Sequence, residues 1–355
     1  MRDSSSLSLR KQHENAREIN MYIIIDCGST NTRLYLVEQE EVKDKHEITI
    51  GVNSTVSDGN NERLKQALTQ AIEDLLGNNA LSLHDVDFAI ASGMITSNLG
   101  LLEVPHLVAP VNINDFAQHT CRVAGYKVLP IDLPIIFIPG VKNDIGEATW
   151  ENIRKIDLMR GEETQAIGVI SSMSLTLPAT IVELGSTTKI IHINKDGAIA
   201  GSITSLSGQV YAAVKKETFI NSSMIDSDND TEDFYCSDIL KHAYQCVSSA
   251  GLLRSLLFTR FIQFSLPTTA AERKFYCECT IAADDMKLFD EAEEQGFALT
   301  GDIIFIGQSA RCKIYQEMLK ETKKINNHMI SITQPEEIAL LGIKGACYIA
   351  KSQIN

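Results

Sequence analysis

Short apolar runs alternate with polar turns along the first part of the chain. Runs at residues 21–26, 33–37 and 46–52 are rich in β-branched residues, and polar turn residues bound them, so each predicts a strand. A helix of about sixteen residues follows, because apolar residues recur there at helical spacing. Those positions are Leu64, Leu68, Ala71, Ile72 and Leu75, and Gly77 is the expected C-cap.

Strands and helices then alternate. Residues 86–91 predict a buried strand that runs into the polar, glycine-bearing loop 92–100, a type of loop that often closes a site. A further strand is expected at 135–139. The segment Arg160–Gln165 predicts the start of a helix, because its two glutamates favour the positive end of the helix dipole.

The second half repeats this order. A strand at 179–184, a turn, a strand at 189–193 and a hairpin into 198–204 form a second three-strand meander. A helical, polar region over about 208–295 precedes two more strand–helix steps. These comprise a strand at 302–306, a helix from Ser309 to about 323, a strand at 329–332 and a helix that starts at Pro335.

This repetition predicts two similar α/β domains that face a cleft. We expect an N-terminal domain over 21–175 and a C-terminal domain over 176–355. The first twenty residues lack the apolar core of a secretory signal and are expected to be a disordered extension. The acidic, serine-rich segment 221–238 is expected to be an exposed loop.

The amino-acid composition and charge limit the classes of partner that the protein is expected to bind. The 355 residues carry 46 acidic and 32 basic side chains, a net charge of −14, which disfavours nucleic acid and anionic membrane surfaces. No apolar run reaches the roughly 20 residues of a membrane helix. The eight cysteines are sparse and form no Cys-x-x-Cys pair, which favours reduced thiols in a cytoplasmic protein. Because the net charge is negative, an anionic ligand would need local cations at its binding site.

Several common sites are absent from the sequence. It contains no Gly-x-Gly, which excludes the Rossmann fingerprint, and no phosphate-binding Gly-x-x-x-x-Gly-Lys-Ser/Thr loop. It also lacks the His-Glu-x-x-His motif of metalloproteases and the Gly-x-Ser-x-Gly elbow of serine hydrolases. No histidine spacing suggests a metal site, and His106, His192 and His328 are interpreted as structural.

Two strand–turn–strand loops occupy equivalent places in the two halves. Glycine, small hydroxyl residues and consecutive N–H groups make such turns suitable for binding an anion. An aspartate at the end of the first strand can hold a hydrated Mg²⁺, and Arg33 or Lys189 would supply positive charge. The candidate residues are Asp26, Gly28, Ser29, Thr30, Asn31 and Arg33 in the first loop and Gly185, Ser186, Thr187 and Lys189 in the second.

The pair resembles the two phosphate loops of the actin, hexokinase and Hsp70 superfamily. Within it, the loop 26–33, Gly93–Asn98, Ile138–Gly140 and above all Arg160-Gly-Glu-Glu-Thr-Gln165 resemble the 2-dehydro-3-deoxygalactonokinase family. The resemblance implies two ribonuclease-H-like (actin-like ATPase) domains around an interdomain cleft. It also implies ATP- and Mg²⁺-dependent phosphorylation of the 6-hydroxyl of 2-dehydro-3-deoxy-D-galactonate, in galactonate catabolism.

The resemblance also implies roles for residues. Glu163 falls where hexokinase-like members carry a catalytic acid, with Glu162 as the fallback base. Arg160 would pair with the substrate carboxylate. Ser97 and Asn98 would line the sugar pocket, and Gly307, Gln308 and Ser309 resemble the adenosine-binding loop of the superfamily.

Two departures leave alternatives open. The family's second phosphate loop reads Pro-Gly-Thr-His-x-Lys, whereas here it is Leu184-Gly-Ser-Thr-Thr-Lys189. The family's glycine-rich helix has no clean match near Cys279–Asp284. A kinase for another keto-sugar acid or sugar, and a nucleotide-binding regulatory protein without transfer activity, remain alternatives. The sequence leaves the oligomeric state open, a homodimer included.

Overall fold

The computed structural model describes residues 21–39, 41–225 and 234–354. The expected extension 1–20 lies outside these residues, as does the centre of the expected loop, 226–233. The chain divides into two compact units. Unit 1 comprises Met1–Glu103 with Cys121–Phe137, and unit 2 comprises Val104–Thr120 with Ile138–Asn355. The division therefore differs from the boundary expected at residues 175 and 176.

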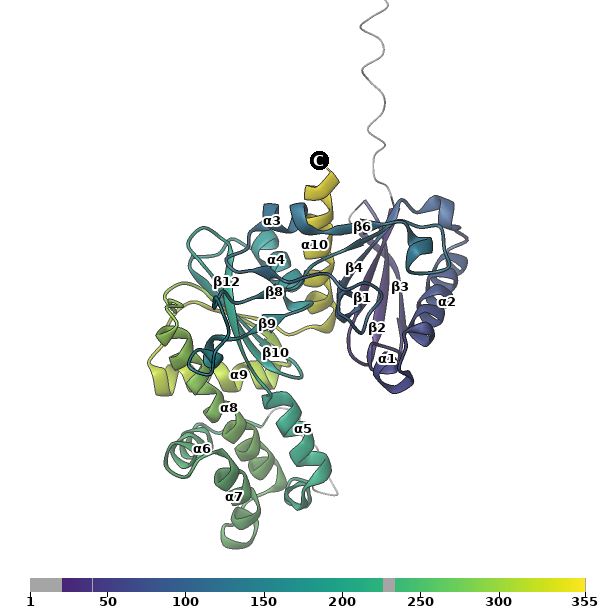
Figure 1. Ribbon diagram of the computed structural model, residues 1–355. Coiled ribbons are helices and arrows are strands. Elements are labelled where there is room, and N and C mark those ends of the chain that lie inside the picture. Colours follow the sequence, from purple (N-terminus) through teal and green to yellow (C-terminus); the bar gives the residue numbers. More distant parts are fainter. Residues whose placement is uncertain (1–20, 40, 226–233, 355) are drawn as a thin grey trace, which may run out of the picture. The chain divides into compact units, whose positions relative to one another are not determined.

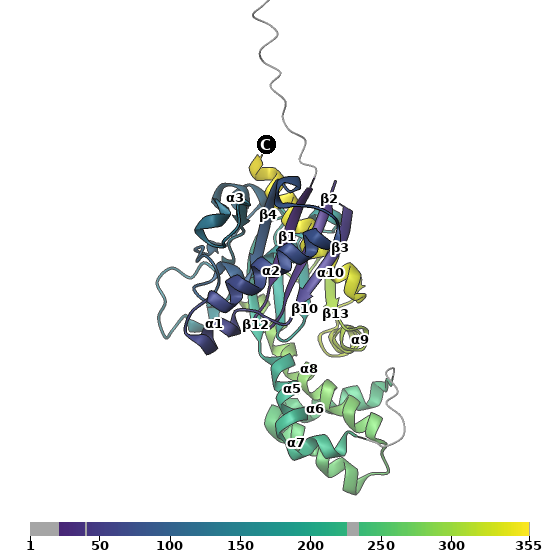
Figure 2. The same ribbon diagram turned by 90° about the vertical axis from the view of Figure 1, so that its right-hand side faces the viewer.

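Unit 1 is built on a six-stranded sheet in the order β3-β2-β1-β4-β7-β6. The first three strands form an antiparallel meander, and β4 and β7 extend the sheet in parallel to β1. Helix α2 packs against β2 and β3 on one face (Figure 2). The strands are β1 (Met21–Cys27), β2 (Thr32–Glu38), β3 (Glu41–Ile48), β4 (Phe88–Gly93), β6 (Cys121–Val123) and β7 (Ile135–Phe137). The helices are α1 (Asn53–Asp58), α2 (Glu62–Asn78), η1 (Leu83–Asp85), η2 (Met94–Thr96) and η3 (Gly125–Lys127).

Unit 2 contains a five-stranded sheet in the order β12-β11-β10-β13-β14. Its meander and its two following parallel strands repeat the first five positions of the sheet in unit 1. The duplication predicted from the sequence is thus confirmed. The strands are β10 (Ala179–Leu184), β11 (Thr188–Ile193), β12 (Ile199–Ser205), β13 (Ile303–Gly307) and β14 (Met329–Ile332). A small three-stranded sheet joins β5 (Leu107–Val108), β8 (Val141–Lys142) and β9 (Leu158–Met159).

Helices of unit 2 form two groups (Figure 1). One group packs around the long helix α8, and a hydrophobic core joins α6, α8 and α9 to β10, β11 and β13. All the described helices of unit 2 are α3 (Ile113–His119), η4 (Ile153–Lys155), α4 (Glu162–Ser172), α5 (Ser207–Glu217), η5 (Phe219–Ser223), α6 (Ser237–Ala250), α7 (Leu252–Ser265), α8 (Ala270–Glu294), α9 (Ser309–Met318), η6 (Leu319–Lys323) and α10 (Pro335–Ile354).

The second group is the pair α4 and α10. A Cβ atom on Gly168 would lie 1.9 Å from the Leu341 carbonyl oxygen, and one on Gly345 would lie 1.8 Å from that of Thr164. Only glycine at both positions allows backbones to approach so closely. This packing explains why residues 138–175 belong to unit 2, since α4 is held by a helix that starts at Pro335.

Two local predictions were wrong. The charged segment 38–45 was expected to precede the third strand, but β3 runs from Glu41 to Ile48, because a strand at a sheet edge can carry charged side chains toward water. Gly77 was expected to be the C-cap of α2, but the helix continues to Asn78. The left-handed conformation that ends this segment is adopted by Ala80 instead.

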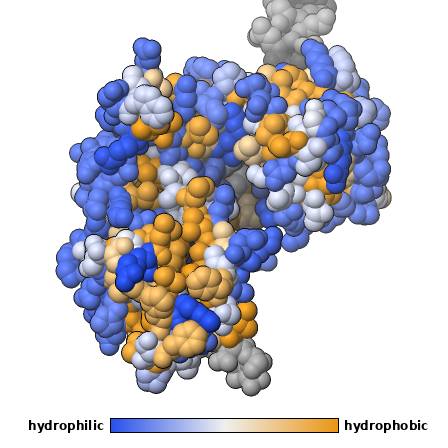
Figure 3. All heavy atoms as spheres, turned by 60° about the horizontal axis from the view of Figure 1, so that its bottom comes forward, coloured by the Kyte–Doolittle hydropathy of each residue, from blue (hydrophilic) through white to orange (hydrophobic). Residues whose placement is uncertain are grey.

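Exposed apolar side chains gather on the helical part of unit 2, where Figure 3 shows them over one face. The large exposed ones in η5, α7 and the residue that follows it are Phe219, Leu253, Phe261, Phe264 and Leu266. Within the described residues, no helix has both the length and the apolar character that crossing a bilayer requires.

Candidate active site

The turn between β1 and β2 lies at the carboxyl end of the central strand of unit 1. The Gly28 N–H donates to the Asn31 carbonyl at 2.9 Å and closes the turn. Its carbonyl groups are occupied as well, since the N–H groups of Val52 and Asn53 donate to Gly28 and Ser29 at 3.2 and 2.9 Å. The turn is therefore anchored to the start of α1.

This anchoring leaves donors available. A Cβ atom on Gly51 would lie 2.4 Å from the Gly28 oxygen, so glycine there allows the close packing. Ser29 and Thr30 are exposed, and within the described residues their N–H groups have no acceptor. Consecutive N–H groups without acceptors form a concavity that suits an anion.

Two side chains flank the turn. Asp26 and Arg33 are ladder partners on β1 and β2, and each side chain is about half exposed. The Arg33 guanidinium lies 3.7 Å from Asp26 and 3.4 Å from Glu47. Asp26 thus presents a carboxylate beside the turn, and Arg33 shares its charge between two acids.

The turn between β10 and β11 repeats this arrangement in unit 2. A Cβ atom on Gly208, in the first turn of α5, would lie 2.4 Å from the Gly185 oxygen and 2.7 Å from that of Ser186. Gly185 and Ser186 are exposed. In the described part of the chain, the N–H groups of Gly185, Ser186 and Thr187 have no acceptor. Each unit therefore has a turn with backbone donors at the place where the sequence predicted a loop, and anion binding by these turns stays a prediction.

Lys189 was interpreted as a cation of this turn, and its position corrects that interpretation. Its side chain is only 3% exposed, and its Nζ donates to the Leu158 carbonyl at 3.0 Å and to Thr204 Oγ1 at 2.6 Å. Asp157 Oδ1 lies 3.5 Å from the same atom. The lysine thus faces the segment that carries β9, and its own strand, β11, is buried along its whole length.

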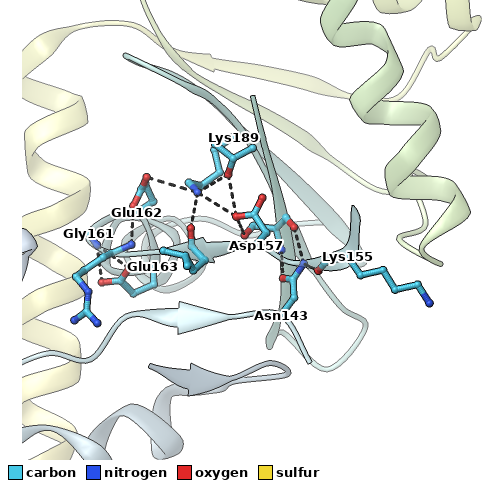
Figure 4. A network of polar contacts seen from close by, with 11 residues as sticks. Asn143, Lys155, Asp157, Gly161, Glu162, Glu163 and Lys189 are labelled. Carbon is cyan, nitrogen blue, oxygen red and sulfur yellow. Dashed lines mark hydrogen bonds and ion pairs between the residues drawn. The ribbon is translucent and has the colours of Figure 1, made fainter. Parts of the chain in front are cut away.

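The buried lysine belongs to a polar network that fastens the segment 143–162 to β12 (Figure 4). Asp157 Oδ1 accepts from the hydroxyls of Ser202 and Thr204 at 3.0 and 2.9 Å. Asn143 donates to the Ser202 carbonyl at 2.8 Å and accepts from its N–H at 2.8 Å. Such a satisfied buried network fixes the loop that leads into α4.

The two acids that begin α4 differ in their surroundings. The Glu162 side chain is 25% exposed; its Oε2 accepts from the Arg160 N–H at 2.9 Å, and its Oε1 lies 3.8 Å from Lys189 Nζ. Glu163 is fully buried, and both carboxylate oxygens accept from the Gly161 N–H, at 2.9 and 2.7 Å. Burial, with a smaller contribution from the charge of Glu162, raises the pKa of Glu163 to about 7.

Arg160, two residues before α4 begins, is partly buried. Its NH2 group donates to the Val104 carbonyl at 3.0 Å and lies 3.1 Å from His106 Nδ1. Burial, followed by the charges of Arg160 and Lys142, lowers the pKa of His106 to about 4. The imidazole is therefore neutral at pH 7, and its Nδ1 can accept from the guanidinium.

The remaining predicted residues lie at two strand ends. In unit 1, Asn98 is exposed, whereas the Ser97 hydroxyl donates to the Met94 carbonyl at 2.7 Å and is turned into its own loop. In unit 2, Gly307 ends β13, and Gln308 and Ser309 are exposed where α9 begins. The strand-to-helix step predicted at this position is present.

Sequence reasoning missed three residues of unit 2. Asp157 stands in a charged segment with no motif around it, and His106 was interpreted as structural. Arg311 donates from NH1 to the Gly185 carbonyl at 2.6 Å and from NH2 to Thr188 Oγ1 at 2.9 Å. Its place two residues after Ser309, just past the loop already singled out, was the one available signal.

These groups fit one type of chemistry. Taken by itself, the turn of each unit offers backbone donors for phosphate oxygens. In unit 2, the start of α4 also carries two carboxylates next to Arg160 in the sequence. Phosphoryl transfer requires such positioning, charge neutralisation and a group that orients the attacking hydroxyl.

Comparison with known proteins gives an independent finding. A model of the family described as 2-keto-3-deoxy-galactonokinase matches residues 26–343. No curated protein matches the chain. A solved structure described as a "putative 2-dehydro-3-deoxygalactonokinase protein from Sinorhizobium meliloti" covers 92% of this chain and 98% of its own, with 18% identity and a TM-score of 0.68.

A glucokinase from Balamuthia mandrillaris in complex with glucose covers 94% of both chains, with 14% identity and a TM-score of 0.43. The Sinorhizobium structure shows the same α/β fold of the actin and hexokinase type, as the sequence predicted. Since the family model spans most of the sequence, the chain belongs to the 2-keto-3-deoxy-galactonokinase family, a family of sugar-acid kinases.

Proposed function

We propose that this protein transfers the γ-phosphoryl group of ATP to the 6-hydroxyl of 2-dehydro-3-deoxy-D-galactonate. The observation that carries the proposal is the pair of anchored turns, whose N–H groups have no acceptor within the described residues. Family membership supports a sugar acid as the acceptor. A net charge of −14 makes such local donors necessary for binding two anionic substrates.

Asp26 is the proposed anchor for Mg²⁺. Its carboxylate is 47% exposed at the end of β1, beside N–H groups that suit phosphate oxygens. Mg²⁺ is commonly bound through one or two carboxylates, water and substrate phosphates, which one exposed aspartate can satisfy. The bound ion would neutralise charge on the phosphates.

We favour Glu162 as the general base, with Glu163 as the alternative. Glu162 is the more exposed of the pair, and the Arg160 N–H and Lys189 hold its two oxygens in a defined orientation. Glu163 has both oxygens on the Gly161 N–H, so it supports the loop that enters the helix. A base must reach the hydroxyl proton, which a partly exposed carboxylate does more readily.

Arg160 is the proposed partner of the substrate carboxylate. A guanidinium can hold one carboxylate through two parallel hydrogen bonds, which Lys cannot. Neutral His106 and the Val104 carbonyl orient the NH2 group of Arg160. Replacement by Lys should therefore raise KM for the sugar acid and leave KM for ATP within about twofold.

The test is a coupled ADP-release assay on a panel of 2-keto-3-deoxy sugar acids, their reduced counterparts and neutral sugars. Glu162→Gln should lower kcat by about 10²–10⁴-fold with little change in ATP affinity. Glu336→Gln is the control, because Glu336 is likewise a first-turn glutamate, exposed at the start of α10. It should retain the activity of the parent.

Each outcome is informative. Turnover of a different acid or sugar would replace the substrate assignment and keep the kinase. ATP binding without turnover on any acceptor would favour a nucleotide-binding regulatory protein. If Glu163→Gln loses turnover while Glu162→Gln keeps it, Glu163 is the base.

A further inference from the structure

Arg311 lies against the β10–β11 turn. It is the third residue of α9, and its two terminal nitrogens donate to the Gly185 carbonyl at 2.6 Å and to Thr188 Oγ1 at 2.9 Å. The contacts therefore bracket the residues whose N–H groups have no acceptor in the described chain. A guanidinium has five N–H donors, so others remain after these two bonds.

Arg311 forms no ion pair within the described residues. Lys189 is paired with Asp157 at 3.5 Å, and Arg33 is paired with Asp26 and Glu47. Among the described residues, no carboxylate lies within 4.0 Å of the Arg311 guanidinium, which instead stacks 5.7 Å from the centre of the Tyr315 ring. In a chain of net charge −14, a positive group at this turn lowers the local cost of holding an anion.

Hydrogen bonds hold in place the side chains that lie behind the Thr188 contact of Arg311. Thr188 Oγ1 lies 3.1 Å from the Tyr315 hydroxyl, which donates to buried Asp285 at 2.5 Å. Asp285 also accepts from Ser205 at 2.7 Å. Burial, and secondarily Asp285, raises the pKa of Tyr315, so its hydroxyl keeps the proton that it donates. Arg311 therefore contacts a turn whose Thr188 hydroxyl is already held by buried hydrogen bonds.

We propose that Arg311 is the cation that unit 2 contributes to the phosphate chain of the nucleotide, in the place that the sequence assigned to Lys189. This inference rests on the proposed function, since it presumes that the turn binds phosphate. The guanidinium holds the turn through its carbonyl and hydroxyl contacts and directs its remaining donors and its charge to the phosphate oxygens.

The test measures the affinity of the intact chain for adenosine, ADP and a non-hydrolysable ATP analogue, with Mg²⁺, by calorimetry. Arg311→Ala should weaken the ADP and ATP-analogue complexes at least tenfold and change adenosine affinity less than twofold. Arg311→Gln keeps a donor for the Gly185 carbonyl without the charge and should show the same loss. Lys313→Ala is the matched control, because Lys313 is an exposed cation two residues further along α9.

Thermal melting of each variant separates structure from binding. Unchanged affinity for ADP in both Arg311 variants overturns the inference, as does an equal loss for adenosine. If the parent binds these nucleotides through Arg311 but phosphorylates no sugar acid, the inference stands and the proposed function fails. If the parent binds no adenine nucleotide, both fail.

Discussion

The β1–β2 turn of unit 1 and the β10–β11 turn of unit 2 have the same strand register, but the cations beside them have different surroundings. Asp26 pairs with Arg33 across the ladder of unit 1, and Glu183 pairs with Lys189 at the equivalent position of unit 2. Arg33 remains about half exposed beside its turn, whereas Lys189 is buried against Asp157. Register places a residue on a strand, and the segments packed around the strand decide what its side chain contacts.

Unit 2 has the segment 143–162 against its meander, which brings Asp157 and Glu162 to the lysine. The cation that contacts the β10–β11 turn is instead Arg311, which comes from α9. A duplicated fold can thus keep two equivalent turns while the cations beside them come from different elements.

The largest expected effect separates the two cations by stability. Lys189→Met leaves Asp157 buried without its partner, which should lower the free energy of unfolding by about 3–5 kcal/mol. Arg33→Met removes an exposed pair and should cost less than about 1 kcal/mol. Urea denaturation of both variants measures this. Adding Asp157→Asn to Lys189→Met should recover part of the loss, and equal losses for Lys189 and Arg33 would contradict the comparison.

A second difference is the buried acid of unit 2. Because the pKa of Glu163 is raised to about 7, the stability associated with its neutral form is complete below its unfolded value of 4.5 and is lost as pH rises through about 7. Glu163→Gln should therefore gain stability relative to the parent between these pH values, by about 1–3 kcal/mol. Denaturation at pH 4.5, 6 and 8 measures the difference. Exposed Glu73→Gln should show no such trend, and a flat difference for Glu163→Gln would refute the assignment.

The last prediction tests whether both turns need close packing. Gly51→Ala and Gly208→Ala each place a Cβ atom 2.4 Å from a turn carbonyl, which should cost about 1–3 kcal/mol and displace the turn. Affinity for Mg-ADP should fall in both. Gly77→Ala is the control, since its Cβ would meet nothing within 4 Å in the last turn of α2, and it should stabilise by at most about 1 kcal/mol. Normal affinity in one glycine variant would assign the phosphates to the other turn.

Local pattern predicted much of the fold. Strand β10 and the start of α10 at Pro335 fall where the sequence placed them, because β-branched runs and an N1 proline are local signals. The two turns followed from repetition of the same signals. The division into units did not, because α4 is held by a helix far along the sequence.

The candidate site was predictable as residue types rather than as contacts. Glu162, Glu163 and Arg160 lie together because they are neighbours in sequence. The direction of Lys189 depends on a segment about thirty residues earlier, and no periodicity reports which face of a doubly buried strand meets an acid. Arg311 and Lys313 look alike in sequence, and only the tertiary position of the turn distinguishes them.

The close crossing of α4 and α10 has a consequence for synthesis. The 162 residues between Ser172 and Pro335 take roughly 8–30 s to translate at about 5–20 residues per second. Throughout that interval the helix that begins with Glu162 and Glu163 lacks the partner that packs at Gly168 and Thr164. The acid pair is made early on the ribosome but acquires its support late, so the nascent chain should pass through a stage in which this apolar helix face is open to chaperones.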